Sequence, residues 1–372
     1  MFKNALRLPF RLLGIPVYLD ITFLVILPIL AWLIGNQIEP FLEILELPID
    51  AEPLITGWTP YLLGLAAAVA LFVSVLIHEL GHAVTARFYG VETERITLWL
   101  LGGMAHFKEM PKQRGAEAVV AIAGPITSFL VGFVAWLGLS FVPVEQGGLY
   151  FVLLYTMYMN VLLAVFNMIP ALPLDGGRVL RSLLALRMSH LQATRMSAGI
   201  SRFLAVALGI FGLLSFNIFL ILIAFFVYMA VTAETQYALF TETLSRFSVD
   251  SLMSRPVISV DPEVTVDEVR KRMMSEARLA FPVRTGGGDF VGEVRLEHLR
   301  EAPPGRVVAE VMSEAPPSIA VTVGANDLFD KMIRDENHRL LVTDESGAVV
   351  GIVTKTDLVR ALQVLSMGPR AM

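Results

Sequence analysis

The chain has 372 residues, of which 55% are hydrophobic and 17% charged, a balance unusual for a soluble protein and ordinary for a membrane protein. The absence of cysteine excludes disulfides and zinc–thiolate sites, so any metal site must use His, Asp or Glu. The formal net charge of -5 is small, and no basic patch with interleaved aromatic residues suggests a nucleic-acid partner. Apolar runs dominate the first part of the chain and a mixed, charged sequence follows. We therefore expect a membrane domain at residues 1–236, a linker at 237–248 and a soluble domain at 249–372.

Apolar runs long enough to cross a bilayer, which takes about 20 residues in a helix, recur along the first domain. They cover residues 14–35, 60–86, 117–142, 149–169 and 199–233. The last run either forms one long tilted helix or divides into two short helices at the polar turn Ser215-Phe216-Asn217. Division gives about six spans, and the predicted fold class is a polytopic α-helical membrane protein.

Lysine and arginine are confined to one side of this arrangement. The connections 36–59, 143–148 and 215–217 contain neither residue, whereas the connections on the other side carry basic residues from Lys3 to Arg202. Cytoplasmic loops are enriched in lysine and arginine. We therefore expect a multi-pass protein of the cell membrane with both termini and the soluble domain in the cytoplasm.

Ionisable side chains interrupt the second apolar run in the sequence HELGH, residues 78–82. On a helix His78 and His82 share one face and can bind one zinc ion. Glu79 lies beside them, close enough to hold a water molecule and act as general base. Because buried ionisable groups are costly in lipid, the pattern predicts a metal site within the membrane.

Catalytic zinc usually takes a third protein ligand. The segment NMIPALPLDGGR, residues 167–178 at the cytoplasmic end of the fourth run, offers Asp175. Its two prolines interrupt the helix, and Gly176 and Gly177 permit a tight turn that would hold Asp175 in the bend. The alternative is an ordinary helix end followed by a loop with a solvated Asp175.

HELGH in one membrane helix, followed by N-x-x-P-x-x-P-L-D-G-G near the end of a later one, resembles the site-2 protease family of intramembrane zinc metalloproteases. The resemblance covers most of residues 10–236. It implies one zinc ion per chain bound by His78, His82 and Asp175, with Glu79 as the catalytic base.

The same resemblance implies that Asn167 lies near the metal and stabilises the oxyanion of the tetrahedral intermediate. The alternative role for Asn167 is to satisfy backbone groups that the helix break leaves without partners.

The segment ITLWLLGGMAHF, residues 96–107, is apolar but too short to span a membrane. Its β-branched start and central glycine pair predict a re-entrant hairpin on the cytoplasmic side. In the resembled family such a segment borders the active site, and its exposed strand edge could pair with an unwound substrate. The residues expected to line this edge are Leu100, Leu101, Gly102 and Gly103. The alternative is an interfacial anchor with Trp99 at the lipid headgroups.

The third apolar run contains AIAGPITS, residues 121–128. Its small residues Ala121, Gly124 and Ser128 allow close helix packing. We expect this segment to be structural and to take no part in the chemistry.

Residues 249–301 and 307–364 form an internal repeat. Each copy opens with a similar phrase, continues with an amphipathic helix and a short apolar strand, and closes with a strand and a helix. The repeat resembles a tandem pair of cystathionine-β-synthase (CBS) domains, which form one compact α/β module. The resemblance implies an adenine-nucleotide site, and the alternative is a purely structural module or one that forms a homodimer.

In the CBS family the closing motif G-h-h-[ST]-x-x-D supplies nucleotide contacts. The second repeat has Thr354 and Asp357 at these places, which could bind ribose or phosphate oxygens. The first repeat has Arg295 and His298 instead. We therefore expect at most one well-formed adenosine-type site.

These patterns favour an intramembrane zinc endopeptidase that hydrolyses peptide bonds of transmembrane substrates and is regulated by a cytoplasmic CBS pair. The alternative is a CBS-regulated divalent-cation transporter or channel, in which the membrane histidines and aspartate bind the transported ion. Glu79 distinguishes the two, because hydrolysis needs a base beside the ligands and transport does not.

Overall fold

The computed structural model describes residues 5–46, 49–100, 102–107, 113–245, 247–303, 305–334 and 339–366. The chain divides into two compact units, Met1–Gln236 and Tyr237–Met372.

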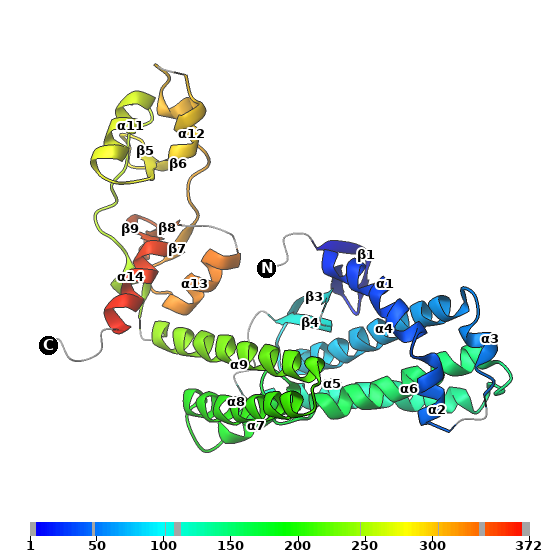
Figure 1. Cartoon of the computed structure of the whole chain (residues 1–372). Coiled ribbons are helices and arrows are strands. Elements are labelled where there is room, and N and C mark those ends of the chain that lie inside the picture. Colours follow the sequence, from blue (N-terminus) through cyan, green and yellow to red (C-terminus); the bar gives the residue numbers. More distant parts are fainter. Residues whose placement is uncertain are drawn as a thin grey trace. The chain divides into compact units, whose positions relative to one another are not determined.

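Long apolar helices dominate the first unit (Figure 1). Five of them within the described residues are long and apolar enough to cross a membrane: α4 (Thr59–Phe88), α5 (Ala116–Leu139), α6 (Gly147–Asn167), α8 (His190–Leu214) and α9 (Ile218–Leu244). A sixth span exists if α1 (Ile21–Gly35) and α2 (Ile38–Ile44), which meet at a bend of 53°, count as one. Two shorter helices are α3 (Glu52–Ile55) and α7 (Asp175–Leu184). The prediction of a polytopic helical membrane protein is confirmed.

The run 199–233 divides into two helices at Ser215-Phe216-Asn217, as the six-span alternative requires. The side chain of Asn217 accepts hydrogen bonds from the first backbone N–H groups of α9, which explains why a new helix begins there.

The start of the first predicted span, residues 14–20, is wrong. Residues Ile15–Leu19 form a strand, and α1 begins only after Asp20, whose carboxylate accepts a hydrogen bond from the Thr22 N–H. The apolar composition of this strand is the same as that of a helix, so hydrophobicity alone could not separate them.

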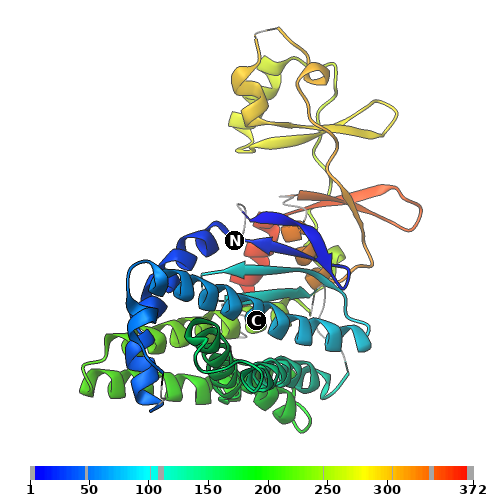
Figure 2. The same ribbon diagram turned by 90° about the vertical axis from the view of Figure 1, so that its right-hand side faces the viewer.

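A mixed sheet lies beside the helices (Figure 2). Its described strands follow the order β1 (Leu6–Leu12), β2 (Ile15–Leu19), β3 (Thr93–Trp99) and β4 (Gly102–Phe107). β2 and β3 are parallel, and the other neighbouring pairs are antiparallel. The predicted hairpin therefore exists as β3 and β4, and β4 is an edge strand among the strands described.

Small residues let the membrane helices approach closely. A Cβ atom added to Gly64 of α4 would lie 2.0 Å from the carbonyl oxygen of Ala31 in α1. One added to Gly81 would lie 2.5 Å from the Thr127 hydroxyl of α5. Such contacts are characteristic of helix pairs in lipid, where apolar burial supplies no driving force.

A buried arginine ties α7 to two neighbouring helices. The Arg181 guanidinium pairs with Glu117 of α5 and with Glu234 of α9, and only 5% of Arg181 is exposed. The hydroxyl of Ser182 also accepts a hydrogen bond from the Ala118 N–H. Because a buried charge is tolerated only with partners, these contacts hold α7 in one position.

The second unit contains the two repeats. The first is built from α10 (Val249–Leu252), α11 (Val266–Ser275), β5 (Ala280–Arg284), β6 (Phe290–Arg295) and α12 (Leu296–Glu301). The second follows as the 3₁₀ turn η1 (Val308–Glu310), β7 (Ser318–Ala320), α13 (Ala325–Arg334), β8 (Arg339–Thr343), β9 (Val349–Thr354) and α14 (Lys355–Ser366). The two apolar cores exchange their opening segments: Val249 and Leu252 of α10 are buried with Leu328 of the second repeat, and Val308 of η1 is buried with Phe281 of the first.

The expected linker at residues 237–248 is largely helical. α9 continues to Leu244, whose side chain is fully buried in the core of the second repeat beside Leu328 and Leu340. The change in composition marks the end of the membrane domain but not the end of the helix.

Candidate active site

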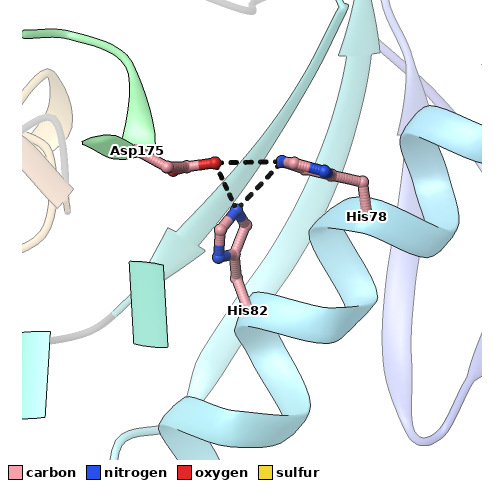
Figure 3. A group of neighbouring side chains, drawn as sticks. All are labelled: His78, His82 and Asp175. Atoms are coloured by element: carbon pink, nitrogen blue, oxygen red, sulfur yellow. Dashed lines mark hydrogen bonds and ion pairs between the residues drawn. The ribbon is translucent and has the colours of Figure 1, made fainter. Parts of the chain in front are cut away.

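Two histidines and an aspartate meet inside the first unit (Figure 3). His78 and His82 lie one turn apart on the uninterrupted helix α4, and Asp175 is the first residue of α7. All three are buried, with exposed fractions of 4%, 5% and 6%. Among the described residues this is the one group of three such side chains close enough to hold a metal ion.

The facing atoms form a nearly equilateral triangle. His78 Nε2 lies 3.1 Å from both His82 Nε2 and Asp175 Oδ2, and His82 Nε2 lies 3.3 Å from Asp175 Oδ2. Tetrahedral zinc with bonds of about 2.0–2.1 Å separates its ligand atoms by about 3.3–3.4 Å. Two imidazoles and one carboxylate with this spacing fit a zinc ion.

A single backbone contact determines the tautomer of His82. Its Nδ1 lies 2.8 Å from the carbonyl oxygen of Val120, which can only accept, so Nδ1 carries the proton. In the neutral ring of this tautomer, His82 Nε2 presents its lone pair to the centre of the triangle, which is the form of histidine that binds a metal ion.

Helix α5 packs against the two histidines. The Ser128 hydroxyl lies 2.8 Å from His78 Nδ1, so α5 engages the Nδ1 atom of each histidine while both Nε2 atoms face Asp175. A Cβ atom added to Gly124 would lie 2.3 Å from His82 Nε2 and 2.7 Å from His78 Nε2. Gly124 and Ser128 allow α5 to pack closely, as expected, and the side chains against which they pack are the two histidines. The spacing of Val120, Gly124 and Ser128 by four residues was the sequence signal that one face of this helix could contact the site.

Asp175 reaches the histidines because the chain doubles back after α6. The sequence predicted a tight turn at Gly176 and Gly177, but the two glycines lie in the first turn of α7. Cβ atoms added to them would lie 2.3 Å from the Met168 oxygen and 2.2 Å from the Leu172 nitrogen. Glycine is required for this close approach of two backbone segments, which no local turn pattern reveals.

Glu79 is half-buried and points toward β4. Its Oε2 accepts a hydrogen bond of 3.0 Å from the Ala105 N–H. Gly103 packs against the same side chain, because an added Cβ would lie 2.6 Å from Glu79 Cγ. The hairpin therefore borders Glu79 through β4.

Only part of the expected substrate edge lies there. Gly102 and Gly103 are in β4, whereas the Leu100 N–H donates to the Thr22 hydroxyl at 3.1 Å and is not free for a substrate. Leu101 lies outside the described residues. Ala105, which the sequence did not single out, carries the backbone donor nearest the base.

Asn167 is the last residue of α6. Its Nδ2 donates at 3.0 Å to the carbonyl of Leu163, one turn back in the same helix, so neither expected role of Asn167 is decided by this contact.

In the second repeat, Thr354 and Asp357 lie at the start of α14. Asp357 Oδ2 accepts hydrogen bonds from the Thr354 N–H at 2.8 Å and from its hydroxyl at 2.6 Å. Oδ1 accepts from the Ser254 hydroxyl of the first repeat at 3.2 Å. Asp357 thus caps its helix and connects the two repeats.

The corresponding place in the first repeat holds an ion cluster. The buried Glu293 pairs with Arg295 at 2.7 Å and with Arg339 of the second repeat at 2.9 Å. The hydrogen bond with Glu293 raises the pKa of the Arg295 guanidinium, so this group stays charged. His298 lies within the same turn, with its Nδ1 3.4 Å from the Arg295 nitrogen.

Comparison with known proteins decides the family. Residues 66–146 and 143–211 match the model of peptidase family M50. The zinc metalloprotease MJ0392 of Methanocaldococcus jannaschii is 31% identical over 359 residues, which cover 96% of each protein. The chain belongs to peptidase family M50.

Other matches extend along this M50 chain. The putative zinc metalloprotease sll0528 of Synechocystis is 30% identical over 374 residues, covering 95% of this chain and 94% of that protein. The solved site-2 protease from Methanocaldococcus jannaschii has 35% identity, covers 62% of this chain and 95% of its own, and gives a TM-score of 0.42. Residues 249–305 and 308–364 each match the CBS domain model. The M50 chain is therefore a multi-pass membrane metalloprotease with a CBS pair, and both predicted family memberships are confirmed.

Removing the Ser128 hydroxyl should weaken zinc binding, because His78 loses the partner that orients its ring. We expect Ser128→Ala to lower zinc affinity by about 10–100-fold, measured by competition with a chelator. Ser197→Ala is the matched control, since Ser197 is equally buried in α8 and its hydroxyl has no hydrogen-bond partner among the described residues. Equal affinities of the two variants would contradict the role of α5.

Proposed function

We propose that this membrane metalloprotease is an intramembrane zinc endopeptidase that cleaves transmembrane substrates. His78, His82 and Asp175 would hold one zinc ion, and Glu79 would be the general base. The observation that carries the proposal is the buried triangle of two imidazoles and a carboxylate, with a second carboxylate on the adjacent residue of the same helix.

Zinc bound at this triangle would act as a Lewis acid that polarises the scissile carbonyl and activates water. Glu79 would take a proton from the attacking water and deliver it to the leaving amine, as a base within reach of the site can do. Asn167 would donate its amide N–H to the oxyanion after releasing the Leu163 carbonyl.

No described strand pairs with the outer edge of β4, which supports the view that the substrate binds there as an added strand. A transmembrane helix that unwinds in lipid leaves backbone groups without hydrogen-bond partners. Each such group raises the free energy by roughly several kcal/mol. A sheet edge at the same depth supplies those partners. Gly103 and Ala105 lie on this edge next to Glu79, so a peptide paired with β4 would reach the base.

The family assignment favours the protease over the alternative of a cation transporter. The pairing of Glu79 with two histidine ligands serves hydrolysis, and the relatives that match along the whole chain are named metalloproteases.

The course of α9 supports the proposal that the CBS pair regulates the protease. This single helix crosses the first unit, pairs with Arg181 through Glu234, and ends with Leu244 in the core of the second repeat. Arg181 lies on α7, whose first residue is Asp175. We infer that ligand binding or homodimer formation at the CBS pair acts on the site through α9 and α7.

Glu79→Gln should retain zinc and lose proteolysis, because glutamine keeps the shape but cannot accept a proton. We expect cleavage of a membrane substrate to fall by about a hundredfold to ten-thousandfold. Zinc content by mass spectrometry and cleavage by gel assay are measured on the same preparation. His78→Ala should lose zinc and activity together, and a Glu79→Gln protein that still cleaves would refute the assignment of the base.

The distribution of basic residues supports an orientation with residues 36–59 outside the cell and the CBS pair in the cytoplasm. The chain has no native cysteine, so single cysteines can be labelled cleanly. We expect Glu46→Cys to react with an impermeant thiol reagent applied to intact cells, and Glu345→Cys to react only after lysis. The reverse pattern would overturn the orientation.

An adenine nucleotide is the ligand that we propose for Thr354 and Asp357. Asp357→Asn keeps an oxygen to cap α14 but removes the charge that would bind the ribose hydroxyls. We expect it to weaken AMP or ATP binding to the full-length protein at least about tenfold by calorimetry. His298→Ala, the control in the other repeat, should change little. A larger effect of His298→Ala, or no nucleotide binding at millimolar concentration, would contradict the proposal.

A further inference from the structure

The base and the strand edge proposed to bind substrate share one hydrogen. The Ala105 N–H, on the edge of the sheet, donates to Glu79 Oε2 at a distance of 3.0 Å. A backbone N–H carries a single hydrogen, so this group cannot form full hydrogen bonds with Glu79 and with another strand at the same time.

The register of β4 shows which of its backbone groups are available to a substrate. Met104 is paired with Thr97, and Ala105 with Ile96, in an antiparallel ladder. Backbone groups of successive residues point to opposite sides of a strand. Because the Ala105 N–H leaves the sheet toward Glu79, the groups of Ala105 and Gly103 face outward and those of Met104 face β3.

Gly103 keeps Glu79 on this edge. An added Cβ would lie 2.6 Å from Glu79 Cγ and 3.3 Å from Cδ, so the side chain lies flat along the strand only because residue 103 is glycine. Val75, one turn before Glu79 on α4, lies against the same glycine, 3.0 Å from that position. The Glu79 side chain is thus positioned on β4 by its packing on Gly103 and by the Ala105 N–H.

We propose that Glu79 and an incoming substrate strand compete for the Ala105 N–H, so that docking of the substrate on β4 releases the base. The inference rests on the proposed function, in which β4 binds an extended substrate and Glu79 is the base. In the substrate-free enzyme the carboxylate accepts a backbone hydrogen bond and is held on the strand. A paired substrate takes over that donor, and the carboxylate, no longer held on the strand, is available to act as the base.

Binding measurements can test the competition without cleavage. Glu79→Gln keeps an acceptor for the Ala105 N–H, whereas Glu79→Ala has none, and both variants lack the base. The probe is a fluorescein-labelled hexapeptide amide of alternating valine and threonine, with affinity measured by anisotropy on the full-length zinc-loaded protein in detergent. We expect Glu79→Ala to bind about three- to tenfold more tightly than Glu79→Gln, the effect of one freed hydrogen bond.

A double-mutant cycle separates the effect of the Glu79–Ala105 hydrogen bond on peptide affinity from the effect of the space that Glu79→Ala opens. Ala105→Pro removes the donor and is tolerated on an outward-facing edge position, and Ala105→Gly is the control that keeps the donor. The difference between Glu79→Ala and Glu79→Gln should vanish with Ala105→Pro and persist with Ala105→Gly. Hydrogen–deuterium exchange should also be faster at Ala105 in Glu79→Ala than in Glu79→Gln, and slow again when the peptide is bound.

Equal affinities of the two Glu79 variants, a difference that survives Ala105→Pro, or binding of the peptide to neither variant would each overturn the proposal. These outcomes are separate from failure of the proposed function. The proposed function would fail if His78→Ala kept its zinc or if Glu79→Gln still cleaved the substrate. Neither result depends on the affinity comparison.

Discussion

The triangle of His78, His82 and Asp175 depends on satisfying polar atoms where water is scarce. Each histidine engages its outer nitrogen with α5, through the Ser128 hydroxyl and the Val120 carbonyl, and turns its inner nitrogen toward Asp175. In lipid an unpaired polar atom costs more than it would at a soluble surface. The packing of α4 against α5 therefore decides where the two rings point, and the ligand geometry follows from it.

Glycine provides the space in which these polar contacts form. Gly124 lets α5 approach the two Nε2 atoms, and Gly176 and Gly177 let the segment after α6 lie against the start of α7. Gly103 does the same between β4 and Glu79. At each of these positions even a methyl group would overlap the two histidines, Glu79 or the backbone that places Asp175. These four glycines thus matter because they have no side chain, which lets neighbouring segments approach closely.

Two further features connect this site to the rest of the chain. β4 brings a strand edge to the base, which suits a substrate that must leave its helical form to be cleaved. α7 carries Asp175 at one end and the buried Arg181 pairs along its length, and one of those pairs involves the helix that continues into the CBS unit. Substrate entry and regulation would thus approach the site from different elements, one through the base and one through the third ligand.

The sequence by itself determined the features that follow from local periodicity and composition. The i, i+4 spacing of His78 and His82, the division of the last apolar run, the glycine-centred hairpin and the repeat of the CBS unit all depend on neighbouring residues. Asp175 was expected near the histidines because catalytic zinc usually takes a third protein ligand and the proline-interrupted segment 167–178 offers a carboxylate on the same side of the membrane.

Tertiary structure alone decided the contacts between distant segments. Strand β2 was taken for the start of a helix, because its partner β3 lies more than 70 residues away in the sequence and apolar composition does not distinguish the two forms. Val120 acts through a carbonyl and Ala105 through an N–H, groups that every such residue carries, so no residue type marks them. Ser128 and Gly124 could be recognised in the sequence as small residues. What they contact depends on how α5 is rotated against α4, which the local sequence does not determine.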